Sequence, residues 1–169
     1  MSIVCYESDL IPRRYRGGVI PYYTDTDGDT GNIYFCFGVD RRHNEYTDFG
    51  GGIKKNESTI QGSLREFHEE SSDCFGRYTE KDLKSCVVLY NHRIIIYFLP
   101  ITKSVAEKAI ATFNGNDEVS RIVSLSLDTL TEILTERTQG LSMYRVVKKC
   151  FFEIPNVEEF ITMLKHRSL

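Results

Sequence analysis

The sequence lacks any apolar stretch long enough to cross a membrane. Its longest uninterrupted apolar run is Ile94 to Leu99, whereas a membrane-spanning helix requires about 20 residues. The first residues, MSIVCYESDLIPRRYR, also lack the basic segment followed by an apolar one that is typical of a secretory signal. We therefore expect a protein that does not span a membrane and that works inside the cell, in the cytoplasm.

An excess of charge of either sign is also absent. The chain has 21 Lys and Arg residues against 24 Asp and Glu residues, which gives a formal net charge of −3. No overall positive field therefore exists to collect nucleic acid or anionic lipid nonspecifically. Any such ligand has to be bound by a local patch.

Cysteine pairs with metal-binding or redox spacing are missing as well. The five cysteines are an odd number and include no C-x-x-C pair, which argues against a disulfide framework or a zinc site. We expect them to be reduced and to pack as small apolar side chains. They are Cys5, Cys36, Cys74, Cys86 and Cys150.

No Pro- or Ser-rich linker, low-complexity tract or internal repeat interrupts the 169 residues. The hydrophobic share of 41% and the charged share of 27% are close to those of globular proteins. A chain of this length buries a core without disulfides or a metal. The sequence therefore predicts one domain over residues 1–169.

Five runs of β-branched and aromatic residues predict strands. Val19–Tyr23 and Ile33–Val39 flank the turn-forming segment TDTDGDTGN and are expected to form a hairpin with a long loop. Residues 84–90 and 93–99 predict a second, tighter hairpin, and residues 121–127 predict a further strand.

Helices are predicted between and after these strands, at 58–72, 104–113, 128–134, 142–152 and 157–167. Residues with N-capping side chains stand at the start of three of them and directly before a fourth, namely Ser58, Asp128, Ser142 and Asn156. Strands mixed with helices on both sides predict an α/β domain built in layers.

The helix at 58–72 carries acidic residues on one face and apolar residues on the other. At about 100° per residue, Glu70 lies about 40° and Glu69 about 60° from Glu66 around the helix axis, whereas Leu64 and Phe67 lie about 100° to 160° away. Like charges within one turn repel each other. Because Mg²⁺ prefers a few carboxylates together with water and phosphate oxygens, this face predicts a divalent cation site.

The segment from Gly51 to Asp73 resembles the signature of the Nudix hydrolase superfamily, G-x5-E-x7-R-E-U-x-E-E-x-G-U, where U is a bulky apolar residue. The motif positions are occupied in order, without gaps, by Gly51, Glu57, Arg65, Glu66, Phe67, Glu69 and Glu70. Ser72 and Asp73 replace the final glycine and apolar residue. Glycine there commonly supplies a left-handed helix cap. With this replacement, the sequence does not predict how the helix ends.

The resemblance implies an α/β/α sandwich on a mixed sheet, here with extra C-terminal helices, and hydrolysis of a nucleoside diphosphate linked to another group. It further implies that Glu66, Glu69 and Glu70 hold Mg²⁺ or Mn²⁺. Glu57 and Arg65 would be structural braces. One glutamate, on this helix or on a later loop, would deprotonate the attacking water.

Residues outside the acidic helix complete the predicted site. Glu118, on a polar loop before a strand, is the candidate fourth carboxylate, so the candidate metal ligands are Glu66, Glu69, Glu70 and Glu118 and the candidate catalytic residues are Glu69, Glu70 and Glu118. The backbone of Gly51 and Gly52 can approach a phosphate closely. Arg41 and Lys54 belong to basic clusters near the acidic helix and are candidate substrate ligands.

Two further patterns favour plain structural interpretations. The run from Asp25 to Asp29 opens like a calcium loop, but Thr30 stands where an EF-hand needs glycine and Cys36 where it needs glutamate. A solvated hairpin loop is the better interpretation. His68 lies at a variable motif position on the polar side of the helix and is expected at the surface.

The substrate stays open between several phosphorylated molecules. Plentiful tyrosines favour a nucleotide, a dinucleoside polyphosphate or an mRNA cap, and a looser similarity to decapping-type Nudix proteins of large DNA viruses would place the protein in the cytoplasm of a host cell. The triple glycine followed by lysines favours a diphosphoinositol polyphosphate instead. A noncatalytic Nudix-fold binding module is the third alternative.

Overall fold

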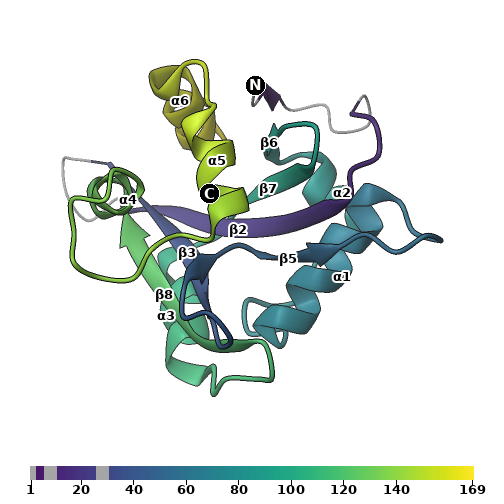
Figure 1. Ribbon diagram of the computed structural model, residues 1–169, viewed down its shortest axis with the longest axis horizontal. Helices are drawn as coiled ribbons and strands as arrows, with labels where there is room; N and C mark the ends of the chain where they lie inside the picture. The colour runs from purple at the N-terminus through teal and green to yellow at the C-terminus, as the bar shows by residue number, and fades with distance from the viewer. Residues whose placement is uncertain (1–2, 6–10, 26–30) are drawn as a thin grey trace.

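A mixed β-sheet forms the centre of the molecule (Figure 1). The computed structural model describes residues 3–5, 11–25 and 31–169, with side chains from residue 11 onward. The main path of the sheet runs in the order β1-β6-β7-β2-β3-β4, while β5 pairs with β2 and β8 pairs with β3. The strands are β1 (Ile3–Cys5), β2 (Arg16–Asp25), β3 (Asn32–Asp40), β4 (Tyr46–Thr47), β5 (Phe49–Gly52), β6 (Val87–Tyr90), β7 (Ile94–Pro100) and β8 (Val119–Ser126).

Both predicted hairpins are confirmed. Strands β2 and β3 pair antiparallel, as do β6 and β7. Strand β2 also pairs with β7 in parallel along most of its length, which joins the two hairpins into one mixed sheet. On the side of β2 that faces away from β7, two strands pair with it: β3 along its second half and the glycine-rich strand β5 along its first half.

Helices cover both faces of this sheet, as Figure 1 shows for α1 and α3 below it and for α5 and α6 above it. The helices are α1 (Thr59–Ser71), α2 (Glu80–Lys84), α3 (Lys103–Thr112), α4 (Leu127–Leu134), α5 (Arg145–Phe152) and α6 (Val157–Arg167). The α/β/α sandwich expected from the sequence is therefore confirmed.

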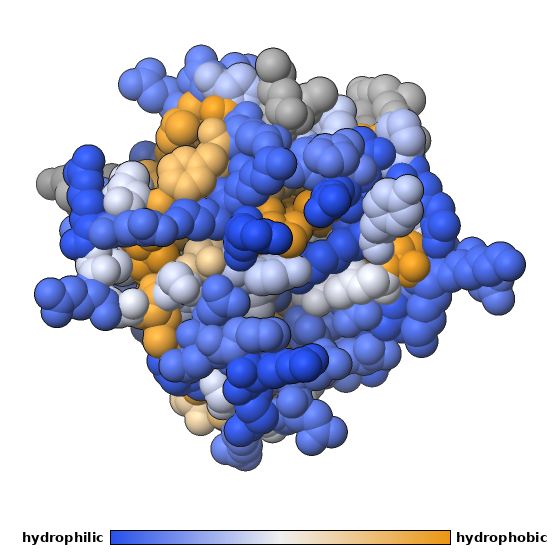
Figure 2. Space-filling model, viewed as in Figure 1, coloured by the Kyte–Doolittle hydropathy of each residue, from blue (hydrophilic) through white to orange (hydrophobic). Residues whose placement is uncertain are grey.

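Two cores lie on opposite faces of the sheet because successive strand side chains point to opposite sides. Ile20 and Phe35 belong to the core under α4, α5 and α6, whereas Val19 and Cys36, each one residue away, belong to the core under α1, α2 and α3. The helix layers thus bury both faces of the central strands. On the face drawn in Figure 2, apolar residues gather toward the upper left, over α5 and α6.

Several predicted boundaries were wrong. Helix α4 is capped by Ser126 rather than Asp128, because the Ser126 hydroxyl accepts from the Thr129 N–H. Helix α5 begins at Arg145 after Tyr144, so Ser142 is not its cap. Residue 84 ends helix α2 instead of beginning a strand, and this short helix was not predicted. The N-caps Ser58 and Asn156 are confirmed by hydrogen bonds to the N–H groups of Gln61 and Glu159.

The sequence also led to expectations about membrane-spanning helices, cysteines and the hairpin loop. No helix in the described part of the chain has the length and apolar character needed to cross a membrane. Cys36, Cys74, Cys86 and Cys150 carry free thiols, and three of these are buried; the side chain of Cys5 lies outside the described residues. The loop interpretation of residues 26–30 falls outside them too. The single domain over 1–169 stays a prediction.

Candidate functional site

Three carboxylates from two separate segments meet at one end of α1. Glu66 and Glu70 lie one turn apart on this helix, and Glu118 lies in the loop before β8. One oxygen of each carboxylate lies within 4.8 Å of the others. They line a cavity of about 640 Å³ together with Gly51, Gly52, Asp117, Tyr144, Asp40, Arg42 and His43.

Helix α1 holds its two glutamates in place through its cap and its core face. The Ser58 hydroxyl accepts from the Gln61 N–H and the Gln61 side chain accepts from the Ser58 N–H, which forms a complete capping box. Phe67, on the opposite face, is fully buried and packs edge-on against Phe49 of β5. The helix therefore cannot rotate without exposing Phe67 or withdrawing the carboxylates from the cavity.

The glycine-rich strand β5 is needed for the close approach of buried carboxylates. A Cβ atom on Gly51 would lie 2.5 Å from the Glu66 carboxyl carbon, and one on Gly50 would lie 2.6 Å from Asp48 Oδ2. Real Cβ contacts essentially never come under 3.0 Å. A Cβ on Gly52, by contrast, would meet nothing within 4 Å. Gly50 and Gly51 thus make room for protein carboxylates, a role that the sequence did not predict.

A pair of substitutions tests this assignment. Gly51→Ala should displace the flexible end of Glu66, so we expect the protein to fold but to need about tenfold more Mn²⁺ for half of its metal-induced rise in Tm. Gly52→Ala, one residue away on the same strand, is the matched control and should keep the wild-type Mn²⁺ dependence. Equal Mn²⁺ dependence of both variants would contradict the assignment of Gly51 as the residue that makes room for Glu66.

Arg65 braces the loop after β5 against the helix. Its guanidinium donates to both oxygens of Glu57 at 3.0 and 2.7 Å, to Glu66 at 2.9 Å and to the Gly52 carbonyl at 3.1 Å. The Glu57 carboxylate also accepts from the Lys54 N–H at 2.7 Å. The network joins Glu57 and Arg65, and their role as structural braces stays a prediction.

The pH dependence of stability should report on this brace. The hydrogen bonds from Arg65 lower the pKa of Glu57 from 4.5 to about 2. Since the folded-state pKa is depressed, the stabilisation is fully present above pH 4.5 and is lost as the pH falls towards 2. We expect the difference in Tm between the wild type and Glu57→Gln to be largest at pH 6 and to shrink steadily by pH 3. A constant difference in thermal melts would exclude an ionised Glu57 from the brace.

The carboxylate of Glu70 lies against a buried ion pair that the sequence analysis missed. Arg16 and the fully buried Asp48 form two hydrogen bonds of 2.8 and 2.6 Å. Arg16 belongs to a basic cluster in the sequence that could contact phosphate, but its guanidinium is held by Asp48 and packs over the Tyr144 ring. No local pattern marked Asp48 as buried; the space for its carboxylate comes from Gly18 and Gly50, on each of which a Cβ would come within 2.6 Å of Asp48 Oδ2.

Burial dominates the electrostatics of Glu70. It raises the pKa of this carboxyl to about 9, and the negative charge of Asp48 and a hydrogen bond with Glu118 act in the same direction, while the Gly50 N–H and Arg16 oppose them. Burial also raises the pKa of Glu66. Crowding carboxylates out of water is unfavourable unless a cation offsets their charge. The donor set, three carboxylates with oxygens in reach of one another, therefore fits Mg²⁺ or Mn²⁺.

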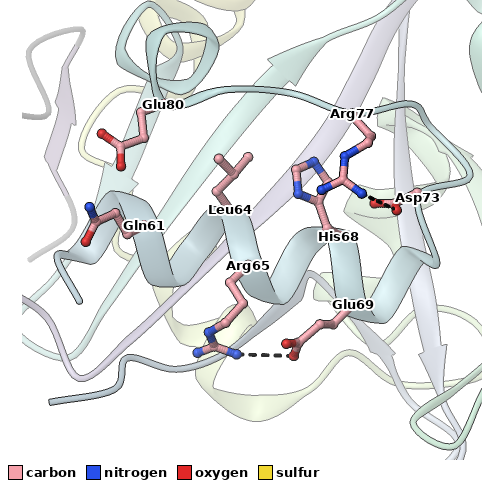
Figure 3. A pocket seen from close by; sticks show the side chains of 8 residues that line it. All are labelled: Gln61, Leu64, Arg65, His68, Glu69, Asp73, Arg77 and Glu80. Atoms are coloured by element: carbon pink, nitrogen blue, oxygen red, sulfur yellow. Dashed lines mark hydrogen bonds and ion pairs between the residues drawn. The ribbon is translucent and has the colours of Figure 1, made fainter. Parts of the chain in front are cut away.

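Glu69 is not part of this cluster. Its side chain is 58% exposed and pairs with Arg65 at 3.2 Å, and Figure 3 shows it turned toward Arg65 on the outer face of α1. A second cavity of about 530 Å³ lies on that face. The roles predicted for Glu69 as metal ligand and catalytic residue remain predictions.

The two predicted basic substrate ligands lie at the edges of the site. The Arg41 Nε atom donates to the Asn116 carbonyl at 2.8 Å, in the loop that carries Glu118. Lys54 is exposed, and its carbonyl accepts from the Arg13 guanidinium at 2.6 Å. A hydrogen bond places the Arg41 side chain, whereas the contacts of Lys54 are made by its main chain. Contact of either side chain with substrate stays a prediction.

The end of α1 differs from expectation at two places. His68 lines the second cavity at the surface but is half-buried, because its Nε2 accepts from the Tyr78 N–H at 3.1 Å; burial lowers its pKa. Ser72 adopts the left-handed conformation itself, with φ 51° and ψ 38°. The helix therefore ends where the glycine would end it, without a glycine.

Two solved structures resemble this chain in fold. No protein-family model matches this chain, and no curated protein matches its sequence. An Ap4A hydrolase of C. elegans, crystallised as a binary complex, matches with a TM-score of 0.53 at 14% identity, over 87% of this chain and 96% of that one. A MutT/Nudix family protein from Listeria innocua matches with a TM-score of 0.52 at 18% identity, over 90% of this chain and 99% of that one. This chain has the Nudix fold.

Proposed function

We propose that the protein is a Mg²⁺- or Mn²⁺-dependent pyrophosphohydrolase that cleaves a nucleoside diphosphate linked to another group. The observation that carries this proposal is the meeting of Glu66, Glu70 and Glu118 within 4.8 Å in an open cavity. The Nudix fold of the chain, in which an acidic helix of this kind follows a glycine-rich strand, supports it.

The three clustered carboxylates differ in burial, and this difference suits them to different roles. Glu66 and Glu70 are partly buried and held by Arg65 and by the Gly50 N–H, so they suit the fixed coordination of a cation. When bound, such a cation lowers the pKa of a water molecule and neutralises charge on bridging phosphates. Glu118 is exposed in the same cavity, where its carboxylate can join them in holding the cation and can also accept the proton of an attacking water.

The cavity wall favours a nucleotide among the candidate substrates. Tyr144, whose ring lies under the Arg16 guanidinium, and His43 both line it, and flat side chains of this kind can stack on a nucleobase. The similarity in fold to an Ap4A hydrolase adds a dinucleoside polyphosphate to the candidates. An mRNA cap belongs to the same class.

Hydrolysis of a panel of diphosphates tests the proposal. The panel should contain Ap4A, a nucleotide sugar, capped RNA and a diphosphoinositol polyphosphate, each with Mg²⁺ and with Mn²⁺. We expect cleavage of at least one nucleoside-linked diphosphate, complete loss with a chelator, and a rate at limiting Mg²⁺ that rises from about pH 6 to 8.5 as Glu70 loses its proton. Lys54→Ala should raise KM and leave kcat nearly unchanged if this lysine contacts phosphate.

Other outcomes of the panel redirect the assignment. Cleavage of the diphosphoinositol alone would favour that alternative, which the exposed Lys54 and Lys55 after the glycine run would serve. Binding of a diphosphate without cleavage would point to a noncatalytic module. A rate that persists with the chelator present would contradict metal-dependent chemistry.

A further inference from the structure

The loop that carries Glu118 is tied to the metal-binding helix through a single asparagine side chain. Asn116 Nδ2 donates to the Glu70 carbonyl at 2.8 Å and to the Ser72 hydroxyl at 3.0 Å. Its Oδ1 accepts from the N–H groups of Glu118 at 3.0 Å and Val119 at 2.8 Å. One amide therefore bridges the end of α1 and the backbone of the third carboxylate.

This contact uses the position at which the sequence departs from the Nudix signature. The last carbonyls of a helix have no partner within the helix, and Asn116 supplies a donor to one of them, that of Glu70. Ser72 adopts a positive φ of 51°, a conformation that glycine would adopt without strain. A glycine, however, has no hydroxyl to accept the second hydrogen bond from Asn116.

Arg41 holds the same loop from the side of β3. Its Nε donates to the Asn116 carbonyl at 2.8 Å, and its backbone N–H donates to the Glu118 carbonyl at 2.8 Å. Gly115 lies under the guanidinium, where a Cβ would come within 2.7 Å of Arg41 Nη2, and has a φ of +85°. The main chain on both sides of Glu118 is thus fixed, although the Glu118 side chain is exposed.

We propose that Asn116 is a positioning residue that holds Glu118 in reach of Glu70, and that Ser72 is its partner in place of the usual glycine. The proposal rests on the proposed function, because it assigns Glu118 to the metal site. An exposed glutamate on a free loop would lose conformational entropy on coordinating a cation. The Asn116 bridge lowers this entropy cost, because it fixes the main chain of Glu118 before any cation binds.

Metal affinity in two backgrounds tests the proposal. Asn116→Ala should need about tenfold or more Mn²⁺ for half of the metal-induced rise in Tm and should lower kcat with little change in KM. In a Glu118→Gln background the same substitution should change the Mn²⁺ requirement by less than about twofold, because its effect acts through Glu118. Asn114→Ala, at an exposed asparagine of the same loop, is the matched control.

The hydrogen bond to Ser72 is tested without metal. The loss of Tm in the double variant Asn116→Ala, Ser72→Ala should be smaller than the sum of the two single losses, because each single substitution already removes the same hydrogen bond. Additive losses would remove Ser72 from the proposal. An effect of Asn116→Ala on Mn²⁺ binding that persists unchanged with Glu118→Gln would overturn the positioning role.

Mn²⁺ binding and diphosphate cleavage by the wild-type protein distinguish a failure of the positioning role from a failure of the proposed function. A wild-type protein that binds Mn²⁺ and cleaves a diphosphate, but whose Mn²⁺ requirement is unchanged by Asn116→Ala, overturns the positioning role alone. A wild-type protein that neither binds Mn²⁺ nor cleaves any member of the panel overturns the proposed function and, with it, the role of Asn116 in the metal site.

Discussion

Glu70→Gln should lower turnover at saturating Mg²⁺ by at least about 10²-fold while leaving the protein folded. Glu70 is central to the site, because it contacts the Gly50 N–H at 2.8 Å and lies between Glu66, Glu118 and the buried Asp48. Glutamine keeps the shape of the side chain and can still accept from Gly50, so the charge is what the substitution removes. Steady-state rates on the purified variant measure the effect.

The same variant should be more stable than the wild type when metal is chelated at high pH. Burial raises the pKa of Glu70 from 4.5 to about 9, so its stabilising contribution is fully present below pH 4.5 and is lost as the pH rises towards 9. Glutamine cannot ionise and escapes this loss. At pH 8.5 with a chelator we expect Glu70→Gln to melt at least about 2 °C above the wild type, and added Mn²⁺ should stabilise the wild type alone.

Glu69→Gln is the neighbouring comparison. The sequence predicts a similar loss of about 10²-fold, because all three helix glutamates share one face, whereas the structure turns Glu69 toward Arg65 and solvent. A much smaller loss than that of Glu70→Gln would remove Glu69 from the catalytic and metal-binding residues. Unchanged turnover of Glu70→Gln would remove Glu70 instead and would contradict the proposed cation site.

Phe67→Ala should destabilise the protein by about 3 to 5 kcal/mol, as truncations of buried phenylalanine typically do. The Phe67 ring is fully buried and lies 5.9 Å from Phe49 and 5.8 Å from Phe75 between ring centroids. Because this ring anchors α1 to β5, activity should be lost only as the fold melts. Chemical denaturation gives the free energy of unfolding.

Phe152→Ala is the matched control for this prediction. Phe152 lies on α5 and is 57% exposed, so the same truncation there should cost well under about 1.5 kcal/mol. If Phe67→Ala unfolds like the wild type yet is inactive, then Phe67 faces the substrate and α1 does not turn this ring toward the core.

The local elements of the fold could be predicted because their signals lie within a few residues of one another. The run of apolar residues at Ile33–Val39 predicts a strand, and the helical spacing of Leu64 and Phe67 predicts which face of α1 is buried. The angular separation around α1 likewise predicted one carboxylate face and one core face. Glu57 and Arg65, whose pairing the sequence predicted, form an ion pair in the structure, and their bracing role stays a prediction.

Tertiary structure decided what lies opposite that carboxylate face. The angle around a helix axis says where a side chain points but not which neighbour it meets, so Glu66 and Glu70 turned toward the cavity whereas Glu69 turned to Arg65. The ion pair of Arg16 and Asp48 joins residues 32 positions apart. Its burial depends on the pairing of β2 with β5, which short glycine-rich segments do not reveal by composition.

The same limit applies to the loop before β8. Glu118 was a candidate by its position alone, but its approach to Glu70 depends on hydrogen bonds from Asn116 to residues 44 and 46 positions away in sequence. Sequence by itself determined the longer strands and helices and the acidic and core faces of α1, because each depends on local periodicity, but it did not reveal the short elements β1, β4, β5 and α2. The assembly of three carboxylates into one site was decided by tertiary structure, because it depends on backbone contacts between segments that no local pattern encodes.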